Sequence, residues 1–371
     1  MILKPLSGWR SGEGKLSKII ANNRGIALLI TISVTTILVA AALEYNRRAR
    51  FEVLATAAVR DRLTLSYMAS SGVHAAMALL IKDKAESNFD TLQEDWANPE
   101  KIDEIIQEIP FDNGKLSVAI TDELSKIQVN ALVKFPDSRQ FNASQVMIWE
   151  RMLNLIGSED DLQDDSNPVS IVNAVKDWLD SGDDEATTGL TGAESSYYEE
   201  QDPPYASRNG PLADLNELLL IKGLTPQLYY GTKDAPGLAN YMTVHGLAVG
   251  AGTSFTWPGR ININTADIPV LAALLGTENQ DLAQAFYEFR QEMAAEKDVH
   301  DFSNPKWYKN ITGFSDVTLD PGLIAISSDV FRIQSTASLN AIQSSVIAVV
   351  QRVQNPESGK WTCQVLNWKM E

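Results

Sequence analysis

The sequence has few residues that carry nucleophilic, redox or metal-thiolate chemistry. It contains one cysteine, Cys363, which excludes an internal disulfide and a zinc site built from several cysteines. The three histidines, His74, His245 and His300, are far apart and fit no H-x-x-x-H or H-E-x-x-H spacing. Neither a Ser-His-Asp, Cys-His or G-x-S-x-G arrangement nor a glycine-rich phosphate loop is visible. These absences predict that the chain is not an enzyme.

Basic residues are also scarce. The 371 residues include 31 lysines and arginines against 48 aspartates and glutamates, which gives a formal net charge of −17. Proteins bind the phosphate backbone through clustered Lys and Arg that displace counterions, so the sequence predicts no nucleic-acid partner. The length exceeds the usual size of a single domain and predicts two packed units.

Charge is missing altogether from one N-terminal stretch. Residues 26–43, IALLITISVTTILVAAAL, are 18 positions without a charged side chain. A helix of this length comes close to the roughly 30 Å hydrocarbon core of a bilayer. The preceding 25 residues carry five lysines and arginines against one glutamate, and this excess favours a cytoplasmic N-terminus. The stretch therefore predicts a single membrane span, with the chain after Leu43 on the outer side of that membrane.

Three interpretations of this N-terminus remain open. A secretory signal peptide would use the small residues Ala40, Ala41 and Ala42, although its apolar region is usually shorter. A plain anchor explains the length but not the glycine directly before it. The third interpretation rests on Arg24-Gly25-Ile26, which resembles the class III leader that a prepilin peptidase cuts after the glycine. In that case Gly25 and Ile26 flank the cut, and residues 1–25 are the leader.

Glycine and proline are absent between residues 26 and 71, and apolar residues continue at helical spacing beyond the span. We expect one continuous helix over about residues 26–81, which is the spine of a pilin. Most pilins of this type have a glutamate as the fifth mature residue, whereas here that residue would be Ile30. An apolar residue at this position is typical of the K-type pseudopilin, which sits at a filament tip with no subunit above it.

Alternating polar and apolar residues predict β-strands near both ends of the remaining chain. Lys115–Thr121 and Lys126–Val133 are expected to form a hairpin around residues 122–124, and helical spacing follows over Gln145–Ile156. Three further strands are predicted to close the sequence as an antiparallel meander with a turn at residues 355–359: Val330–Leu339, Ser345–Val353 and residues 361–370.

The middle of the chain is strongly acidic. Residues 159–202 contain fourteen carboxylates and one base, Lys176, interleaved with apolar residues at helical spacing that favour folding over disorder. Crowded carboxylates in a folded segment need a counter-charge, and a calcium ion with flexible oxygen coordination supplies it. The spacing is not that of an EF-hand. We predict a structural calcium site in which Asp180, Asp183 and Asp184 converge with Glu194, and a solvated acidic face is the alternative.

This acidic region also resembles the helical insertion of the K-type minor pseudopilins of type II secretion systems (general secretion pathway protein K). The motifs that carry the resemblance occur in order: Asp177-Trp178-Leu179-Asp180, Gly192-Ala193-Glu194, Tyr197-Tyr198, Pro204-Tyr205, Asn209-Gly210-Pro211, Glu217-Leu218 and Gly223. The resemblance implies calcium binding in this domain, leader removal by a prepilin peptidase, and methylation. It also implies assembly with I-type and J-type minor pseudopilins at the tip of a periplasmic pseudopilus, where the subunit helps initiate or limit assembly during protein export.

Two segments look like helix-hairpin-helix modules, because each places an apolar helix before a glycine turn: Asp214–Thr225 and Ile261–Gly276. Thr265 or Asn264 is the expected N-cap of the second helix. DNA-gripping hairpins need nearby Lys or Arg, and the first has only Lys222. We therefore expect a structural role. An inner-membrane-anchored DNA-uptake protein is the alternative function, and an anchored hydrolase using acidic pairs is a further rival.

Together these patterns predict an α+β fold in which a pilin-like N-terminal helix packs on an antiparallel sheet. A large, mostly helical inserted domain with helix-hairpin-helix or SAM-like elements would interrupt the sheet. The expected segments are a leader at 1–25, a transmembrane segment at 26–43 within the helix at 26–81, a first part of the sheet at 100–140, the acidic helical insertion at 141–323, and the last part of the sheet at 324–371.

Overall fold

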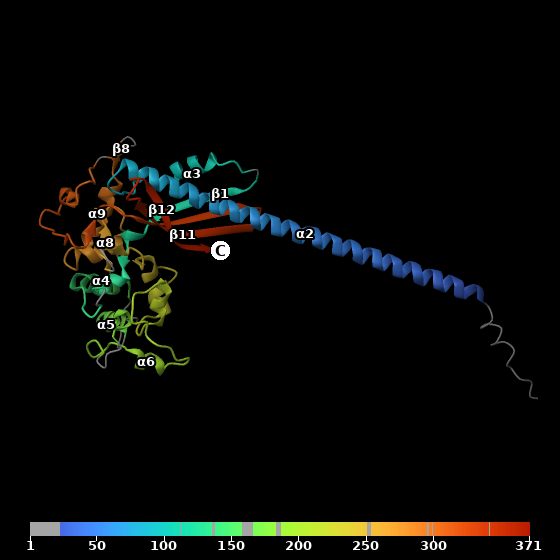
Figure 1. Ribbon diagram of the computed structural model, residues 1–371, viewed down its shortest axis with the longest axis horizontal. Coiled ribbons are helices and arrows are strands. Elements are labelled where there is room, and N and C mark those ends of the chain that lie inside the picture. Colours follow the sequence, from blue (N-terminus) through green and yellow to red (C-terminus); the bar gives the residue numbers. More distant parts are fainter. Residues whose placement is uncertain are drawn as a thin grey trace, which may run out of the picture. The chain divides into compact units, whose positions relative to one another are not determined.

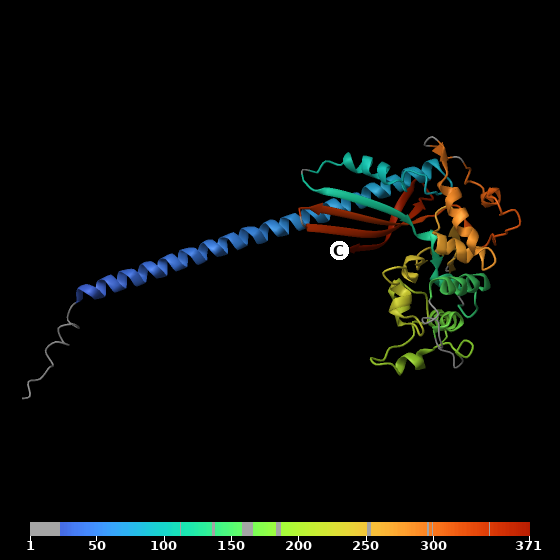
Figure 2. The ribbon, with the colours of Figure 1, turned by 180° about the vertical axis from the view of Figure 1, so that it is seen from behind.

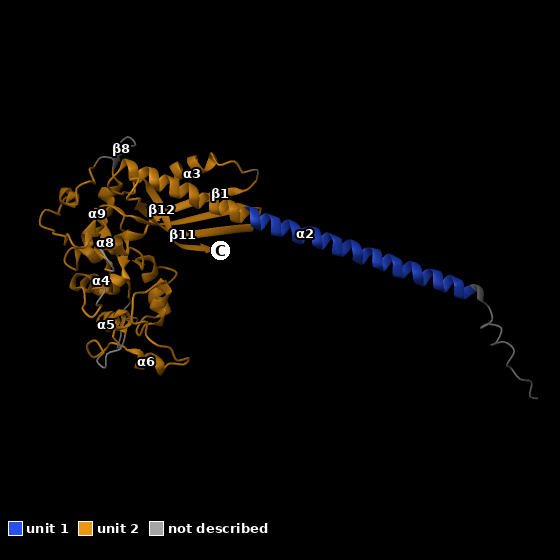
Figure 3. Cartoon of the chain, viewed as in Figure 1, with its two compact units in different colours: residues 1–64 blue, residues 65–371 orange. Residues whose placement is uncertain are grey.

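The computed structural model describes residues 23–111, 113–135, 138–157, 166–182, 187–250, 254–294, 297–298, 300–340 and 342–371 (Figures 1 and 2). It combines a long N-terminal helix, an antiparallel sheet and many short helices, which confirms the predicted mixture of helix and sheet. The chain divides into two compact units, residues 1–64 and residues 65–371 (Figure 3).

The N-terminal helix α2 runs without interruption from Asn23 to Glu86. This confirms the single continuous helix predicted from the absence of glycine and proline. In the first unit its apolar side chains are exposed, and it is the one helix of the described chain that is long and apolar enough to cross a membrane. The hydroxyls of Thr31, Thr35 and Thr36 donate to backbone carbonyls three or four residues earlier, so they present no unsatisfied donor to an apolar environment.

The second unit contains a four-stranded antiparallel sheet in the order β1-β10-β11-β12. Its strands are β1 (Lys115–Asp122), β10 (Val330–Leu339), β11 (Ile342–Gln354) and β12 (Trp361–Met370). The predicted closing meander is confirmed. At the turn before β12, the Asn355 side chain accepts the backbone N–H groups of Glu357 and Ser358, and Gly359 takes a positive φ.

The predicted hairpin between Lys115–Thr121 and Lys126–Val133 is wrong. Strand β1 pairs with β10 instead. In the second segment only residues Ile127–Gln128 form a strand, β2, which pairs in parallel with β3 (Met242–Thr243). The carboxylate of Asp122 accepts the Leu124 N–H and closes a turn, and Gln128 caps the short helix that follows. Residues 129–132 are all buried, so both sides of this segment pack inward.

From Leu65 onward α2 runs along one face of the sheet (Figures 1 and 2). The approach is close, because a Cβ atom on Gly72 would lie 2.3 Å from Oγ of Ser335 in β10. The core between them is apolar and includes Leu65, Val73, Leu80, Ile120, Phe331, Ile333, Val346 and Ala348. Helix α3 (Pro99–Gln107) buries Ile102 and Ile106 in the same core.

The segment between β1 and β10 has its own hydrophobic core, built around side chains such as Trp149, Tyr198, Phe286 and Trp307. Its helices are η1 (Glu123–Ser125), η2 (Val129–Leu132), α4 (Ala143–Ile156), α5 (Pro168–Leu179), α6 (Ser195–Glu199), η4 (Leu215–Leu220), α7 (Pro226–Tyr230), η5 (Leu238–Asn240), α8 (Ile268–Leu275), η6 (Gln280–Leu282), α9 (Ala283–Gln291) and η7 (Trp307–Asn310). Its remaining strands are two residues each: β4 (Ala248–Val249), β5 (Phe255–Thr256), β6 (Ile261–Asn262), β7 (Met293–Ala294), β8 (Lys297–Asp298) and β9 (Ile324–Ala325).

The two segments that resemble helix-hairpin-helix modules each contain a helix before a glycine of positive φ, which is Gly223 in the first and Gly276 in the second. The expected N-cap of α8 is wrong, because Asp267 occupies that position. Thr265 instead donates its hydroxyl to Asp122, and the Asn264 side chain accepts the indole N–H of Trp307. These polar side chains are used to join separate parts of the chain rather than to start the helix.

Candidate metal centre

The acidic centre is built at the end of helix α5. The Asn167 side chain accepts the Ser170 N–H, and Pro168 follows as the first helical residue, so the sequence fixes where the helix starts. The helix buries apolar residues including Ile171, Val175 and Trp178. Its last residue is Leu179, and Asp180 is the C-cap. Because the apolar side chains of this helix are buried, the carboxylate of Asp177 is also buried beside them.

Three carboxylates meet there. Asp177, Asp180 and Glu194 each offer one oxygen atom, and these oxygens lie within 4.8 Å of one another. All three side chains are buried, and Asp177 has no exposed surface. Oxygen-only donors of this kind fit a hard cation such as calcium and do not fit a softer thiolate-binding metal.

Lys176 supplies part of the counter-charge. Its Nζ donates at 2.8 Å to Oδ2 of Asp180 and at 2.8 Å to the Thr188 hydroxyl, and it lies 3.9 Å from Oδ1 of Asp177. One ammonium against three carboxylates leaves the centre with two negative charges when all are ionised. That deficit matches the charge of one divalent cation.

The backbone of Thr188 and the space beside Gly192 fix the position of the Asp177 carboxylate. The Thr188 N–H lies 3.0 Å and 3.1 Å from its two oxygens, and these hydrogen bonds favour the ionised form. Burial has the larger effect and raises the pKa of Asp177. Gly192 completes the enclosure, because a Cβ atom there would lie 2.0 Å from Oδ2 of Asp177. The glycine is therefore needed for the carboxylate to reach its position.

Aromatic rings hold the segment that carries Glu194 against α5. Glu194 is the N-cap of α6, and Tyr198 in that helix packs edge-on against Trp178 with ring centroids 5.0 Å apart. The Tyr198 hydroxyl accepts the Lys222 N–H, and burial raises the pKa of Tyr198 far above its usual value. Tyr205 packs on Tyr198 and donates its hydroxyl to the Leu220 carbonyl. These contacts explain why the tyrosine pair and the Pro-Tyr motif accompany the acidic residues.

The predicted metal ligands are placed in part. Asp180 and Glu194 are brought together, whereas Asp183 and Asp184 lie outside the described residues. Sequence reasoning did not choose Asp177 as a ligand, although it precedes Asp180 by three positions in a helical segment. That spacing puts both residues on one side of a helix and was the available signal.

A second group of carboxylates was not predicted from the sequence. Asp83, Asp90 and Glu94 also bring oxygens within 4.8 Å of one another. Here a guanidinium already supplies the counter-charge, because Arg352 contacts Asp83 at 3.0 Å and Asp90 at 2.6 Å. Burial, reinforced by the neighbouring carboxylates Glu94 and Asp90, raises the pKa of Asp83 to about 7. This group therefore fits a structural ion-pair cluster.

The predicted leader residues lie in α2. Gly25 and Ile26 are both exposed and helical, and a Cβ atom on Gly25 would meet nothing within 4 Å. Cleavage between them stays a prediction.

Comparison with known proteins identifies similarity in the inserted region. Residues 125–233 match the family "Type II secretion system (T2SS), protein K". Type II secretion system protein K of Klebsiella pneumoniae is 28% identical over 208 residues, or 56% of this chain and 60% of the relative. The putative protein K of Escherichia coli K12 is 29% identical over 212 residues, or 56% of this chain and 59% of the relative. The chain thus spans about 60% of the length of these curated relatives.

A solved structure shares the fold. A chain of the GspK-GspI-GspJ complex from the type 2 secretion system of enterotoxigenic Escherichia coli superimposes with a TM-score of 0.59 and 18% identity. The superposition covers 85% of this chain and 99% of that chain. The family match lies on the acidic region whose motifs were compared above, and the fold likeness extends to the helix and sheet. The resemblance of this chain to protein K of type II secretion systems is confirmed.

Proposed function

We propose that this chain is a minor pseudopilin of a type II secretion system that sits at the tip of the periplasmic pseudopilus. There it helps initiate or limit pseudopilus assembly during protein export. One observation carries the proposal: a pilin-like helix packed on an antiparallel sheet is interrupted by a domain that contains the protein K family region at residues 125–233. Such a domain is too bulky for the side of a closely packed filament.

The N-terminal helix supports an inner-membrane location. Its apolar segment is exposed along residues 26–43, which fits a single-pass anchor, with a cytoplasmic N-terminus and a periplasmic body. A prepilin peptidase would cut between Gly25 and Ile26, and methylation would follow. Ile30 would then be the fifth mature residue. A tip subunit has no neighbour above it whose N-terminal amine needs a glutamate there.

I-type and J-type minor pseudopilins are the proposed partners, since the solved structure with the same fold comes from a GspK-GspI-GspJ complex. Long apolar helices are the surfaces through which such subunits would meet in the membrane.

Calcium is proposed as a structural ion in the acidic centre. Asp177, Asp180 and Glu194 would hold it, and Asp183 and Asp184 are further candidates from the sequence. A bound cation would neutralise the buried carboxylates and tie the end of α5 to the start of α6. The chain itself positions the oxygens through the Thr188 N–H and the space left by Gly192. No catalytic role is proposed for this centre.

For the inserted domain we propose a finer description: α8 and α9 around Gly276 form a helix-hairpin-helix or SAM-like element. The packing of α8 against α9 supports this description. A DNA-uptake function is not favoured, because the net charge of −17 opposes binding to a phosphate backbone.

A genetic experiment tests the function. The gene would be deleted in its host, and export of the secreted proteins and the length of assembled pseudopili would be measured. We expect loss of export, restored by the intact gene but not by one in which residues 125–233 are removed. Normal export in the deletion strain would contradict the proposal. Purified DNA added to the protein at low and high salt gives the test of the alternative, with no binding expected at either.

A further inference from the structure

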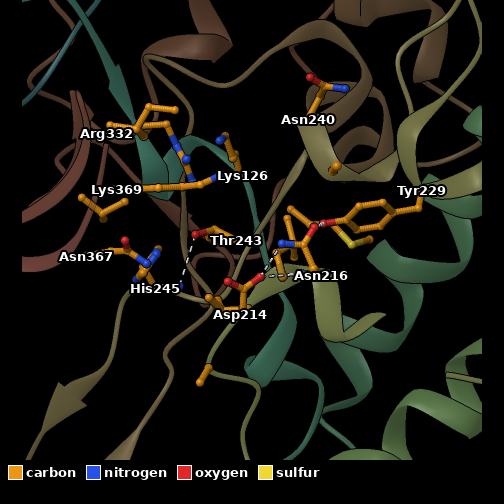
Figure 4. A pocket seen from close by; sticks show the side chains of 17 residues that line it. Lys126, Asp214, Asn216, Tyr229, Asn240, Thr243, His245, Arg332, Asn367 and Lys369 are labelled. Carbon is orange, nitrogen blue, oxygen red and sulfur yellow. Dashed lines mark hydrogen bonds between the residues drawn. The ribbon is translucent and has the colours of Figure 1, made fainter. Parts of the chain in front are cut away.

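A polar pocket of about 550 Å³ lies between the sheet and the inserted region (Figure 4). Its basic residues face an equal number of carboxylates, one on the lining and two in ion pairs: Lys126, Arg332 and Lys369 against Asp214, Glu123 and Glu371. Because these charges balance, the pocket favours neither an anion nor a cation as its ligand.

A second pocket, of about 490 Å³, carries an excess of positive charge. It is formed by the residue before β6, the segment around η7 and the segment that leads into and past β9. Among the described residues that line it are three basic side chains and no carboxylate: Arg260, Lys306 and Lys309. Its volume lies within the range of small-ligand sites in proteins. This pocket is therefore the better candidate for a charged ligand.

The carboxylates nearest in the chain do not cancel this excess. Asp320 accepts the Gly322 N–H at 2.8 Å and the Ser144 hydroxyl at 3.1 Å, so its oxygens are engaged by these donors. Asp316 belongs to the same segment, and neither aspartate lines the pocket. None of the three basic side chains forms an ion pair within the part of the chain that the structure describes. The positive charge of the pocket is thus uncompensated.

Most donors of the three cations are available to a ligand. The guanidinium of Arg260 and the ammonium of Lys306 have no hydrogen-bond partner in the described chain, and both residues are exposed. Lys309 is half-buried and donates one hydrogen bond of 2.9 Å to the Ser315 carbonyl, which leaves two of its three protons free. A planar guanidinium with free terminal amino groups is suited to binding a carboxylate.

The rest of the pocket is largely apolar. Leu319 and Ile324 are buried in its floor, Ile326 is half-buried, and the Tyr308 ring is 2% exposed. Small-ligand sites typically combine such an apolar lining with a few polar groups that fix the orientation of the ligand. A ligand that fits this lining has an apolar body as well as a charged end.

Hydrogen bonds hold the walls of the pocket together. The Gly259 carbonyl accepts the Gln145 side-chain amide at 2.8 Å, and the Ile261 N–H donates to the Leu323 carbonyl at 2.8 Å, so the backbone is fixed on both sides of Arg260. Opposite, the Tyr308 hydroxyl accepts the Leu319 N–H at 3.2 Å. Because the walls are already in place, a ligand would not have to order them on binding.

We propose that this pocket binds a small organic anion with a compact apolar body, such as an arylalkyl carboxylate. The carboxylate would lie among Arg260, Lys306 and Lys309, and the apolar body would cover Leu319 and Ile324. The chain as a whole has a net charge of −17 and repels anions, so an anion would be attracted locally at this pocket. Such binding goes beyond the function proposed above, because assembly into a pseudopilus requires no small ligand.

Isothermal titration of the full-length chain in detergent micelles tests the chemistry of the ligand. The probes are 3-phenylpropionate, its neutral isostere 3-phenylpropanamide, and acetate, which lacks the ring. We expect 3-phenylpropionate to bind saturably and the other two to bind about tenfold more weakly, with affinity falling as salt is raised. Equal binding of the amide would overturn the proposal, because the cations would then play no part. Equal binding of acetate, or no saturable binding of 3-phenylpropionate, would overturn it as well.

Two pairs of variants locate the site. Arg260→Gln and Lys306→Gln each remove a cation that lines the pocket, whereas Arg139→Gln and Lys233→Gln remove exposed cations that do not. We expect each of the first two to weaken 3-phenylpropionate binding about fivefold, and the other two to leave it unchanged. Partition into the micelle is not saturable and is the same for all four proteins. Circular dichroism checks that each variant is folded, and equal effects within both pairs would reject this pocket as the site.

Discussion

Arg352 donates a hydrogen bond of 2.6 Å from Nη2 to Oδ1 of Asp90, although the two residues are 262 positions apart in the sequence. Both side chains are buried. The guanidinium also contacts Asp83 at 3.0 Å, donates to the Ser328 carbonyl, and lies over the Phe331 ring with 4.6 Å to its centroid. This arginine joins the end of α2, the loop after it and strands β10 and β11.

Removing Arg352 should therefore destabilise the protein strongly. Arg352→Met leaves Asp83 and Asp90 buried without their cation, and we expect a loss of about 3–5 kcal/mol in the free energy of unfolding. Arg260→Met is the matched control at an exposed arginine, with an expected change of about 0.5 kcal/mol or less. Chemical denaturation followed by circular dichroism measures both. Similar losses in the two variants would contradict this role of Arg352.

The same cluster should make stability depend on pH. Burial raises the pKa of Asp83 to about 7, above the 3.8 of the unfolded chain, so the folded state binds its proton more tightly. The protonated Asp83 carboxyl group therefore contributes to folding stability at low pH, and this contribution is lost as the pH rises toward 7. When the pH is lowered from 7.5 to 5, we expect the free energy of unfolding of the wild type to rise by about 2 kcal/mol relative to that of Asp83→Asn. Comparing the two proteins cancels other groups, such as His245, whose lowered pKa acts in the opposite direction.

Unfolding curves at the two pH values test this expectation. A difference between wild type and Asp83→Asn that stays constant with pH would show that Asp83 titrates normally.

Calcium should stabilise the folded chain through the acidic centre. A ligand selective for the folded state adds about 2.7 kcal/mol at one hundred times its dissociation constant, so the midpoint of thermal unfolding should rise when calcium replaces a chelator. Asp177→Asn should abolish this rise, since it removes one of the three converging carboxylates. Asp234→Asn, at an exposed position, should retain it. A full calcium shift in Asp177→Asn would rule out the assigned ligands.

Gly192→Ala tests the enclosure of the centre without removing a ligand. The added Cβ atom would lie 2.0 Å from Oδ2 of Asp177 and 2.9 Å from the Thr188 backbone, so the carboxylate must move. We expect a loss of about 1–3 kcal/mol in stability and weaker calcium binding by titration calorimetry. At Gly210 the nearest atom to such a Cβ is 3.9 Å away, so Gly210→Ala should behave like the wild type. Unchanged calcium binding in Gly192→Ala would refute the close-packed geometry.

Mass spectrometry of the mature N-terminus distinguishes the interpretations of the N-terminal segment. Gly25→Ala adds a methyl group that meets nothing within 4 Å, so any effect on the chain comes from processing. We expect Gly25→Ala to accumulate the precursor, and the wild type to begin at Ile26. Ala42→Leu should be processed normally. A wild-type chain that begins near Leu43, with processing blocked by Ala42→Leu, would establish a secretory signal peptide instead.

The spacing of apolar residues correctly predicted those helices and strands in which that spacing is regular along the whole element. Helix α2 has no glycine or proline between Gly25 and Gly72, and Val330–Leu339 is a strand with the predicted bounds. The hairpin failed because alternation over Lys126–Val133 does not reveal that both sides of the segment are buried. Capping by Asp122 and Gln128 then favoured turns over a strand.

Sequence reasoning found part of the acidic centre because its residues are near in the chain. The Arg352 cluster could not be found this way. Its members come from distant segments, and only the pairing of β10 with β11 and the packing of α2 bring them together. The polar pocket that Lys126, Asp214, Arg332 and Lys369 line was hidden for the same reason, since these residues share no local motif.

The register of β1 and β10 places Asp122 directly opposite Phe331. The inserted region therefore leaves the sheet and returns to it at facing positions of two neighbouring strands, as the loop of a hairpin does. The entropy of closing such a loop grows only with the logarithm of its length, so the domain can gain or lose whole helices at little cost to the strand pairing. The sheet and the domain it carries are thus free to change in evolution at different rates, one held by register and the other by its own core.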